Sequence, residues 1–407
     1  MTPFFNQRLL SQITPDPQEP QLPNAMSFQL PAEFQHQPTP FYYYNLGLLD
    51  QTLAALAAAA RPGNFRVHYA LKANSNLPVL ARVRQAGLGA DCVSGGEVAR
   101  ALEAGFGADD VVFAGVGKSD AEINLALAAD IFCFNAESVP ELRVLDELAR
   151  AQGRRARVAL RINPNVDAYT HPHITTGLDA NKFGISLPDL AGVLEQLEQL
   201  PNVELIGLHA HIGSQITELS VFAALSRKLN DLQTWLEDRG HHLPHLNVGG
   251  GLGISYEQPD EHPIPDFATY FGLFNQYLQR RPGQQVHVEL GRSVVAQCGT
   301  LLSRVLYVKE SQHTRFAILD AGMTELMRPA LYGSHHHIQN LSSQLSELAY
   351  DIVGPICEST DTFGRARLLP ETQRHDLLAI RSAGAYGEVM SSGYNLREKA
   401  AAVYGGE

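Results

Sequence analysis

The stretch VHYALKAN, residues 67–74, has the pattern of a short apolar strand that runs directly into a lysine, Lys72. Its first residues have the β-branched and aromatic side chains typical of a buried strand, and polar residues follow at once. Seven further segments of this kind follow it along the chain. The eight expected strands are 67–70, 89–93, 111–114, 131–134, 157–162, 205–211, 245–248 and 285–289.

Helical patterns separate these strands. Leucines at 225, 229, 232 and 236 recur on one helical face, as do apolar residues at 139, 142, 145 and 148. Repeated strand–helix units favour a closed parallel (β/α)8 barrel, the TIM barrel, with an open doubly wound sheet as the alternative. Beyond about residue 291 the segments become short, β-rich and broken by Gly and Pro. This change predicts a barrel over 45–290 and a C-terminal mostly-β domain over 291–407.

Composition excludes several functional classes. The net charge of −12, from 43 acidic and 31 basic side chains, disfavours binding to nucleic acid or to anionic membrane surfaces. No stretch is apolar for long enough to span a membrane, and the N-terminus has no secretion-signal pattern. The four cysteines do not read as a disulfide framework. We therefore expect a cytoplasmic protein, with Cys92, Cys133 and Cys298 as small buried side chains.

In a barrel of this kind the chemistry gathers where the strands end. Lys72 follows the first strand, where partial desolvation would lower its pKa and make the neutral amine a nucleophile. The same spacing also fits a surface lysine. The sixth strand ends at His209-Ala-His211-Ile-Gly-Ser214. Its two histidines could bind zinc, or His211 could stack on a flat ligand while Ser214 binds an anion.

The last two strands end in a glycine run and in a carboxylate. Gly249, Gly250 and Gly251 allow backbone N–H groups to surround a phosphate. Glu289, two residues before Gly291 and three before Arg292, lies at the mouth of the same barrel. A lysine, a stacking histidine, a phosphate cup and a carboxylate fit pyridoxal 5′-phosphate best: Lys72 forms the imine, and Glu289 keeps the ring nitrogen protonated.

These strings resemble those of the fold-type III pyridoxal-phosphate decarboxylases, and further strings narrow the resemblance to the diaminopimelate decarboxylase family. The first set is Tyr69-Ala-Leu-Lys72-Ala-Asn-Ser-Asn76, His209-Ala-His211-Ile-Gly-Ser-Gln215, the Gly249–Gly251 run and Glu289-Leu-Gly-Arg292. The second set is Asp320-Ala-Gly-Met323, Arg328-Pro-Ala-Leu-Tyr332, Gly354-Pro-Ile-Cys357-Glu358-Ser and Gly384-Ala-Tyr386-Gly. The likeness runs in order from about Phe41 to Arg397.

The resemblance implies the fold of the alanine racemase and ornithine decarboxylase enzymes and the conversion of meso-diaminopimelate to L-lysine and CO2. Lys72 would hold the cofactor as a Schiff base, and Cys357 would act beside the reacting carbon. The other implied cofactor-binding residues are His211, Ser214, Gly249, Gly250, Gly251, Glu289, Gly291, Arg292 and Tyr386. The implied substrate-binding residues are Arg292, Arg328, Tyr332, Glu358 and Tyr386.

The resemblance also implies a homodimer, in which Cys357 and Glu358 reach the partner's active site, and an N-terminal segment, 1–44, that joins the β domain. Two positions depart from the usual family pattern: Leu290 replaces a proline, and Gly393 replaces a common asparagine. Neither removes a functional group, although each can loosen its loop.

Three rival interpretations remain. A sister decarboxylase would act on ornithine, arginine or carboxynorspermidine, a zinc hydrolase would use His209 and His211, and a regulatory homologue would lack catalysis. The triplet at 335–337 is expected to be a solvated loop rather than a metal cluster, because adjacent residues do not face one way. The Thr175–Gly177 loop is expected to help close the site.

Overall fold

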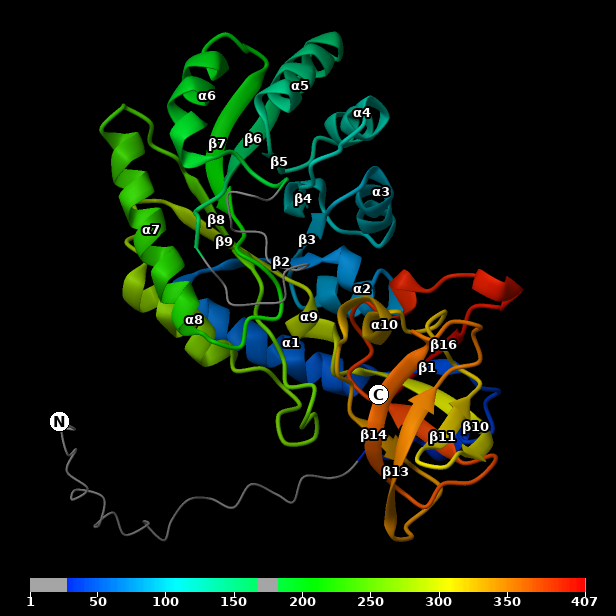
Figure 1. Ribbon diagram of the computed structural model, residues 1–407. Coiled ribbons are helices and arrows are strands. Elements are labelled where there is room, and N and C mark those ends of the chain that lie inside the picture. The colour runs from blue at the N-terminus through cyan, green and yellow to red at the C-terminus, as the bar shows by residue number, and fades with distance from the viewer. Residues whose placement is uncertain (1–27, 167–181, 407) are drawn as a thin grey trace, which may run out of the picture.

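The protein, as a computed structural model that describes residues 28–166 and 182–406, consists of a closed parallel barrel and a second, mostly β part below it (Figure 1). The barrel strands are β2 (Arg66–Ala70), β3 (Gly89–Cys92), β4 (Val111–Phe113), β5 (Cys133–Ala136), β6 (Ala156–Ile162), β7 (Val203–Ala210), β8 (His245–Gly250) and β9 (Gln285–Leu290). The predicted TIM barrel is confirmed, and the open sheet is wrong. The fourth strand begins at Cys133 rather than at Ile131.

Helices surround the barrel (Figure 1). They are α1 (Leu46–Ala60), α2 (Leu77–Gln85), α3 (Gly95–Glu103), α4 (Asp120–Ala129), α5 (Val139–Ala151), α6 (Leu190–Leu197), α7 (Ser220–Glu237), α8 (Phe267–Tyr277) and the short α9 (Arg292–Val295). Side-chain caps fix several starts, such as the box at α4, where Ser119 and Glu122 exchange hydrogen bonds. The leucine face of α7 is buried against the barrel, as its period predicts.

The second part is an eight-stranded sheet. Its strands are β1 (Phe41–Asn45), β10 (Gly299–Glu310), β11 (Arg315–Leu319), β12 (Ile338–Asn340), β13 (Glu347–Val353), β14 (Thr362–Pro370), β15 (Leu377–Ile380) and β16 (Ala401–Gly405), and α10 (Arg328–Tyr332) lies beside it. The β-type sequence patterns at 301–308, 316–320, 348–353 and 376–381 correspond to β10, β11, β13 and β15, but the other four strands were not predicted. Three of the four depend on partners distant in sequence, whereas β14 pairs with the preceding strand, β13. β1, for example, lies between β10 and β16.

Strand register brings two strands that lead to expected site residues next to each other. β2 pairs with β9, and Tyr69 faces Leu290 across the pair. The strand that leads to Lys72 therefore closes the barrel against the strand that carries Glu289. Among the described residues no helix is long and apolar enough to cross a membrane. Residues 1–27 of the N-terminal segment and the Thr175–Gly177 loop lie outside the described residues.

Candidate active site

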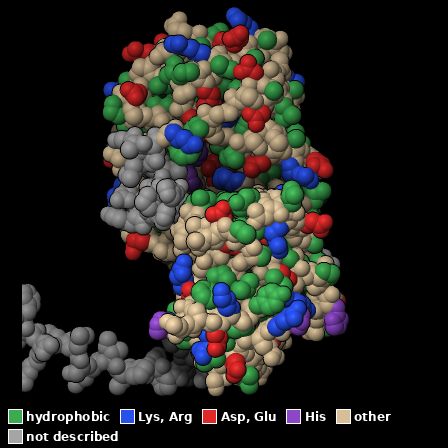
Figure 2. Space-filling view, turned by 45° about the vertical axis from the view of Figure 1, so that its right-hand side comes forward, with side chains coloured by type: hydrophobic (Ala, Val, Ile, Leu, Met, Phe, Trp, Pro, Cys, Tyr) green, Lys and Arg blue, Asp and Glu red, His purple; other side chains and the backbone are tan. Residues whose placement is uncertain are grey.

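Two adjoining cavities, of about 770 and 440 Å³, open at the carboxyl ends of the barrel strands. Figure 2 shows this face hollowed between the barrel and the second sheet, with charged side chains gathered in the hollow. The two cavities share five lining residues, which come from three strand ends and from the second part: Lys72, His211, Ser214, Arg292 and Tyr386. The structure thus brings together most of the site residues expected from the sequence.

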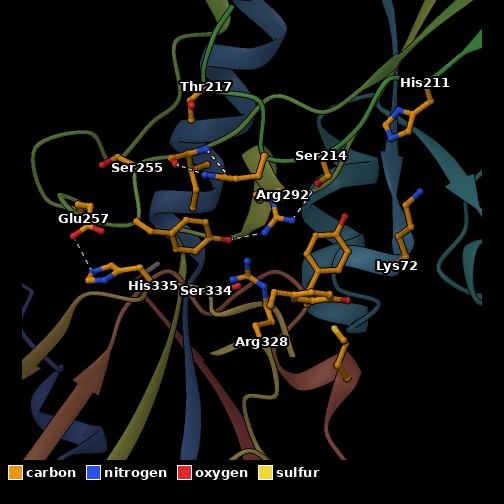
Figure 3. Close-up of a pocket in the computed structure, with 16 residues that line it drawn as sticks. Lys72, His211, Ser214, Thr217, Ser255, Glu257, Arg292, Arg328, Ser334 and His335 are labelled. Atoms are coloured by element: carbon orange, nitrogen blue, oxygen red, sulfur yellow. Dashed lines mark hydrogen bonds and ion pairs between the residues drawn. The ribbon is translucent and has the colours of Figure 1, made fainter. Parts of the chain in front are cut away.

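Lys72 points into the cavity from the turn after β2 (Figure 3). Its Nζ donates to Oδ2 of Asp91, at the end of β3, over 2.8 Å. Burial favours the neutral amine, but the attraction of Asp91, Tyr386 and Glu289 together with the Asp91 hydrogen bond raises the pKa of Lys72 above its ordinary value. The expected depression of this pKa is therefore wrong, because the sequence pattern did not place a carboxylate beside the lysine.

Asp91 is fully buried, and its second oxygen has no partner among the described residues. Burial and the neighbouring charge of Glu289 raise the pKa of Asp91 to about 6. This carboxylate can therefore accept a proton more readily than an ordinary aspartate. It lies in contact with the amine expected to carry the cofactor.

Glu289 lies one residue before the end of β9, inside the barrel mouth, and is 7 % exposed. One oxygen accepts hydrogen bonds from the side-chain amides of Asn135 (3.1 Å) and Asn247 (2.7 Å), and the other accepts from Nε2 of His209 (3.1 Å). Burial opposes its charge, but the attraction of His209 and Lys72 and the His209 hydrogen bond hold the pKa of Glu289 well below its usual range. Glu289 is thus a fixed negative charge at the cavity floor.

Gly249, Gly250 and Gly251 form a cradle of backbone in which no residue with a side chain would fit. A Cβ on Gly250 would lie 1.6 Å from the carbonyl oxygen of Glu289, and one on Gly249 would lie 2.3 Å from that of Ala210. Gly251 has φ of +102°, and its Cβ would meet the Gly213 carbonyl at 2.4 Å. Side chains are therefore excluded here, and backbone is exposed to the cavity at Gly251.

His211 borders this cradle, and its Nδ1 accepts the N–H of Gly250 over 3.2 Å. Burial and the positive charge of Arg161 lower the pKa of His211 to about 3. A neutral, flat imidazole therefore faces the cavity, as a stacking role requires. His209 is committed instead to Glu289, which argues against the two-histidine zinc site.

Arg292 begins α9 directly after Gly291. Its guanidinium donates to Oγ of Ser214 (3.1 Å) and to the hydroxyl of Tyr256 (2.7 Å), and it lies 4.9 Å from the ring centroid of Tyr386. Ser214 and Tyr386 are therefore held in one cluster with Arg292. Gly291 is packed closely, since a Cβ there would lie 3.0 Å from that of Ala73.

Arg328 (Figure 3) and Tyr332, both on α10, line the larger cavity. Arg328 is 5 % exposed and donates to Nε2 of His336 over 2.9 Å. The expectation of a solvated loop at 335–337 is therefore wrong for His336, which is 1 % exposed. The loop folds back onto α10, and local sequence gave no sign of this.

Cys357 and Glu358 lie outside both cavities of their own chain. Both are exposed, and Glu358 accepts a hydrogen bond from the hydroxyl of Tyr394 over 2.9 Å. Cys92, Cys133 and Cys298 are buried, as predicted. The structure of one chain thus does not bring Cys357 and Glu358 to the lysine.

The residues of the smaller cavity fit pyridoxal phosphate. A lysine amine, a side-chain-free backbone cradle, a neutral imidazole and a buried carboxylate converge on about 440 Å³, a size typical of small-ligand pockets. Sequence reasoning missed Asp91, Arg161 and Tyr256. The first two lie at or near strand ends, which was a usable signal, whereas Tyr256 lies in a loop without regular structure.

Comparisons with known proteins agree with this geometry. The family described as "Pyridoxal-dependent decarboxylase, pyridoxal binding domain" matches residues 49–296. The chain is 55 % identical to a diaminopimelate decarboxylase of Bacteroides thetaiotaomicron, over 90 % of this chain and 95 % of that protein. It is 44 % identical to one of Neisseria meningitidis serogroup B, over 90 % and 87 %. The crystal structure of a Helicobacter pylori diaminopimelate decarboxylase complexed with L-lysine is also similar, with a TM-score of 0.86 and 39 % identity over 91 % of this chain and 93 % of that one.

Proposed function

The chain belongs to the pyridoxal-dependent decarboxylases, and from this membership we propose that it converts meso-diaminopimelate to L-lysine and CO2, with pyridoxal 5′-phosphate as cofactor. The observation that carries the proposal is the pair of buried guanidinium groups, Arg292 and Arg328, that line the same cavity as Lys72. A substrate with a carboxylate at each end needs such cations at the end that does not react.

We propose that Lys72 carries the cofactor and that the backbone of Gly249 to Gly251, with Gly291 and Ser214, binds its phosphate. For this, the N–H groups of Gly249 and Gly250 would exchange their acceptors on Asn247 and His211 for the phosphate. Tyr386 would complete the phosphate site beside Arg292, and His211 would cover one face of the ring. The charge of Glu289 supports its assignment to the pyridine nitrogen. When bound, the cofactor supplies an electron sink for the bond that breaks.

The chain's own residues would then orient the substrate and move protons. Arg292, Arg328 and Tyr332 would bind the distal carboxylate, and Glu358 would bind the distal amine. Asp91 contacts Nζ of Lys72 at 2.8 Å, so it can take up or return the proton of that amine. Cys357 would deliver the proton to the carbon that loses CO2.

We further propose a homodimer in which Cys357 and Glu358 act in the site of the partner. Their exposure outside the cavities of their own chain supports this arrangement. Mixing two inactive variants, Lys72→Ala and Cys357→Ala, tests it. Subunit exchange should restore about a quarter of wild-type turnover, because half of the dimers then hold one intact site. If the subunits exchange but turnover is not recovered, the proposal that each active site is built from both subunits is contradicted.

The domain division proposed is 1–44, 45–290 and 291–407, and the pairing of β1 with β10 and β16 supports joining the N-terminal segment to the β part. We propose a cytoplasmic location, which the four unpaired cysteines support.

The second candidate is a sister decarboxylase for ornithine, arginine or carboxynorspermidine. Ornithine and arginine have no distal carboxylate, so a site for them would leave Arg292 and Arg328 buried without an anion. Buried cations without a counter-charge are costly, which disfavours this candidate.

A spectrum of the purified protein followed by a product assay tests the proposed function. We expect a visible absorbance band from covalent attachment of pyridoxal phosphate, and formation of lysine from meso-diaminopimelate. Lys72→Ala should lose both. An absorbance band without lysine formation would contradict meso-diaminopimelate as the substrate, although it would still support pyridoxal phosphate as the cofactor. No band after reconstitution with pyridoxal phosphate would reject the whole proposal.

A further inference from the structure

Arg328 is held by a histidine whose protonation state the geometry fixes. Nη1 of Arg328 lies 2.9 Å from Nε2 of His336, and Nδ1 of His336 lies 2.8 Å from the carbonyl oxygen of Arg381. A guanidinium can only donate and a carbonyl can only accept. His336 therefore carries its proton on Nδ1 and accepts from Arg328 through Nε2. It is neutral, and protonation of Nε2 would break the contact.

Tyr256 lies between the two arginines of the cavity. Its hydroxyl accepts a hydrogen bond from Nη1 of Arg292 over 2.7 Å, and the guanidinium carbon of Arg328 lies 4.9 Å from its ring centroid. The ring of His336 meets the ring of Tyr256 edge-on, with centroids 5.0 Å apart. The phenol thus contacts both cations, and its packing against the imidazole fixes its plane.

Neither guanidinium forms an ion pair with a carboxylate in the described ranges 28–166 and 182–406. Both side chains are at least nine-tenths buried, and Nε of Arg292 has no hydrogen-bond partner there. Two adjacent buried positive charges repel each other, so neutral acceptors are the groups that can hold them without cancelling their charge. Such an arrangement keeps both charges available for an anionic ligand.

We propose that Tyr256 and His336 are positioning residues that set the two guanidinium groups for the substrate carboxylate that is retained. This inference rests on the proposed function, since it assigns that carboxylate to Arg292 and Arg328. Tyr256 would fix the spacing of the pair, and His336 would fix the direction in which Arg328 presents its remaining N–H groups.

The test compares two ligands that differ by one carboxylate. L-lysine, the expected product, retains that group, whereas cadaverine (1,5-diaminopentane) is lysine without it. Dissociation constants for both are measured by calorimetry on the cofactor-loaded enzyme, together with kcat and KM for meso-diaminopimelate. The variants are Tyr256→Phe, which removes only the hydroxyl, and His336→Phe, which removes the acceptor. His336→Gln serves as a matched control, because its amide oxygen can accept from Arg328.

We expect Tyr256→Phe and His336→Phe to weaken the binding of L-lysine roughly tenfold or more, which is the effect of losing one hydrogen bond to a charged group. The dissociation constant of cadaverine should change less than about twofold, because cadaverine lacks the carboxylate that the arginines are proposed to bind. KM should rise more than kcat falls, and His336→Gln should recover part of the affinity for L-lysine.

Equal weakening of both ligands would overturn the proposal, because it would indicate general damage to the cavity. Unchanged binding of L-lysine would overturn it as well. If His336→Phe fails to fold, the binding constants of Tyr256→Phe for L-lysine and cadaverine test the proposal by themselves. Wild-type enzyme that forms no lysine from meso-diaminopimelate would reject the proposed function instead, so the two failures are distinguishable.

Discussion

Replacing Gly250 by alanine is expected to damage both the fold and the cofactor site. The new Cβ would lie 1.6 Å from the carbonyl oxygen of Glu289, whereas real Cβ atoms essentially never approach closer than 3.0 Å. β8 and β9 must therefore separate locally by at least about 1.4 Å. The obstacle is backbone, so no side-chain rotation can relieve it. Overpacking commonly costs about 1–3 kcal/mol, and this case should reach or exceed ~3 kcal/mol.

Gly272→Ala is the matched control. Gly272 lies in the middle of α8, is exposed, and has no atom within 4 Å of an added Cβ. Alanine there should stabilise the protein by about 0.5–1 kcal/mol, because glycine weakens a helix interior. Urea unfolding of both variants, with titration of pyridoxal phosphate, measures the two effects. A Gly250→Ala protein with wild-type stability and cofactor affinity would refute the proposed cradle.

Three further changes test the site and the barrel. Cys357→Ala should lower turnover by ~10²–10⁴-fold while cofactor absorbance persists, and unchanged turnover would remove Cys357 as proton donor. Asp91→Asn removes the carboxylate that keeps Lys72 charged, so the pKa of Lys72 should fall. The rate of pyridoxal phosphate attachment should then reach half its maximum at lower pH, and an unshifted profile would contradict this.

Burial, with Arg66 beside it, lowers the pKa of His68 from 6.5 to about 4. The unfolded chain therefore takes up this proton first, and stability present above pH 6.5 should be lost as pH falls toward 4, by up to about 1.4 kcal/mol per pH unit. Urea unfolding at stepped pH measures this slope, which His68→Gln should reduce.

The strands of the barrel were predictable because each is a short apolar segment with its own helix, and such local patterns survive in sequence. In the second sheet, β14 carries Arg365 and Arg367 among its apolar residues, and it could not be recognised without its partner β13. β12, of three residues, is too short for any periodicity. Pairing with a neighbouring strand, rather than local propensity, decides such strands.

Within the site, the sequence by itself determined the chemical groups: a lysine, a glycine run and a glutamate, each at the end of an expected strand. Only the tertiary structure decided which of these groups are charged and which are buried. Asp91 reverses the expected pKa shift of Lys72, and His336, expected in solvent, is buried against Arg328. Charge–charge interactions and hydrogen bonds act over a few ångströms between residues far apart in sequence, so they depend on distances that only the folded chain defines.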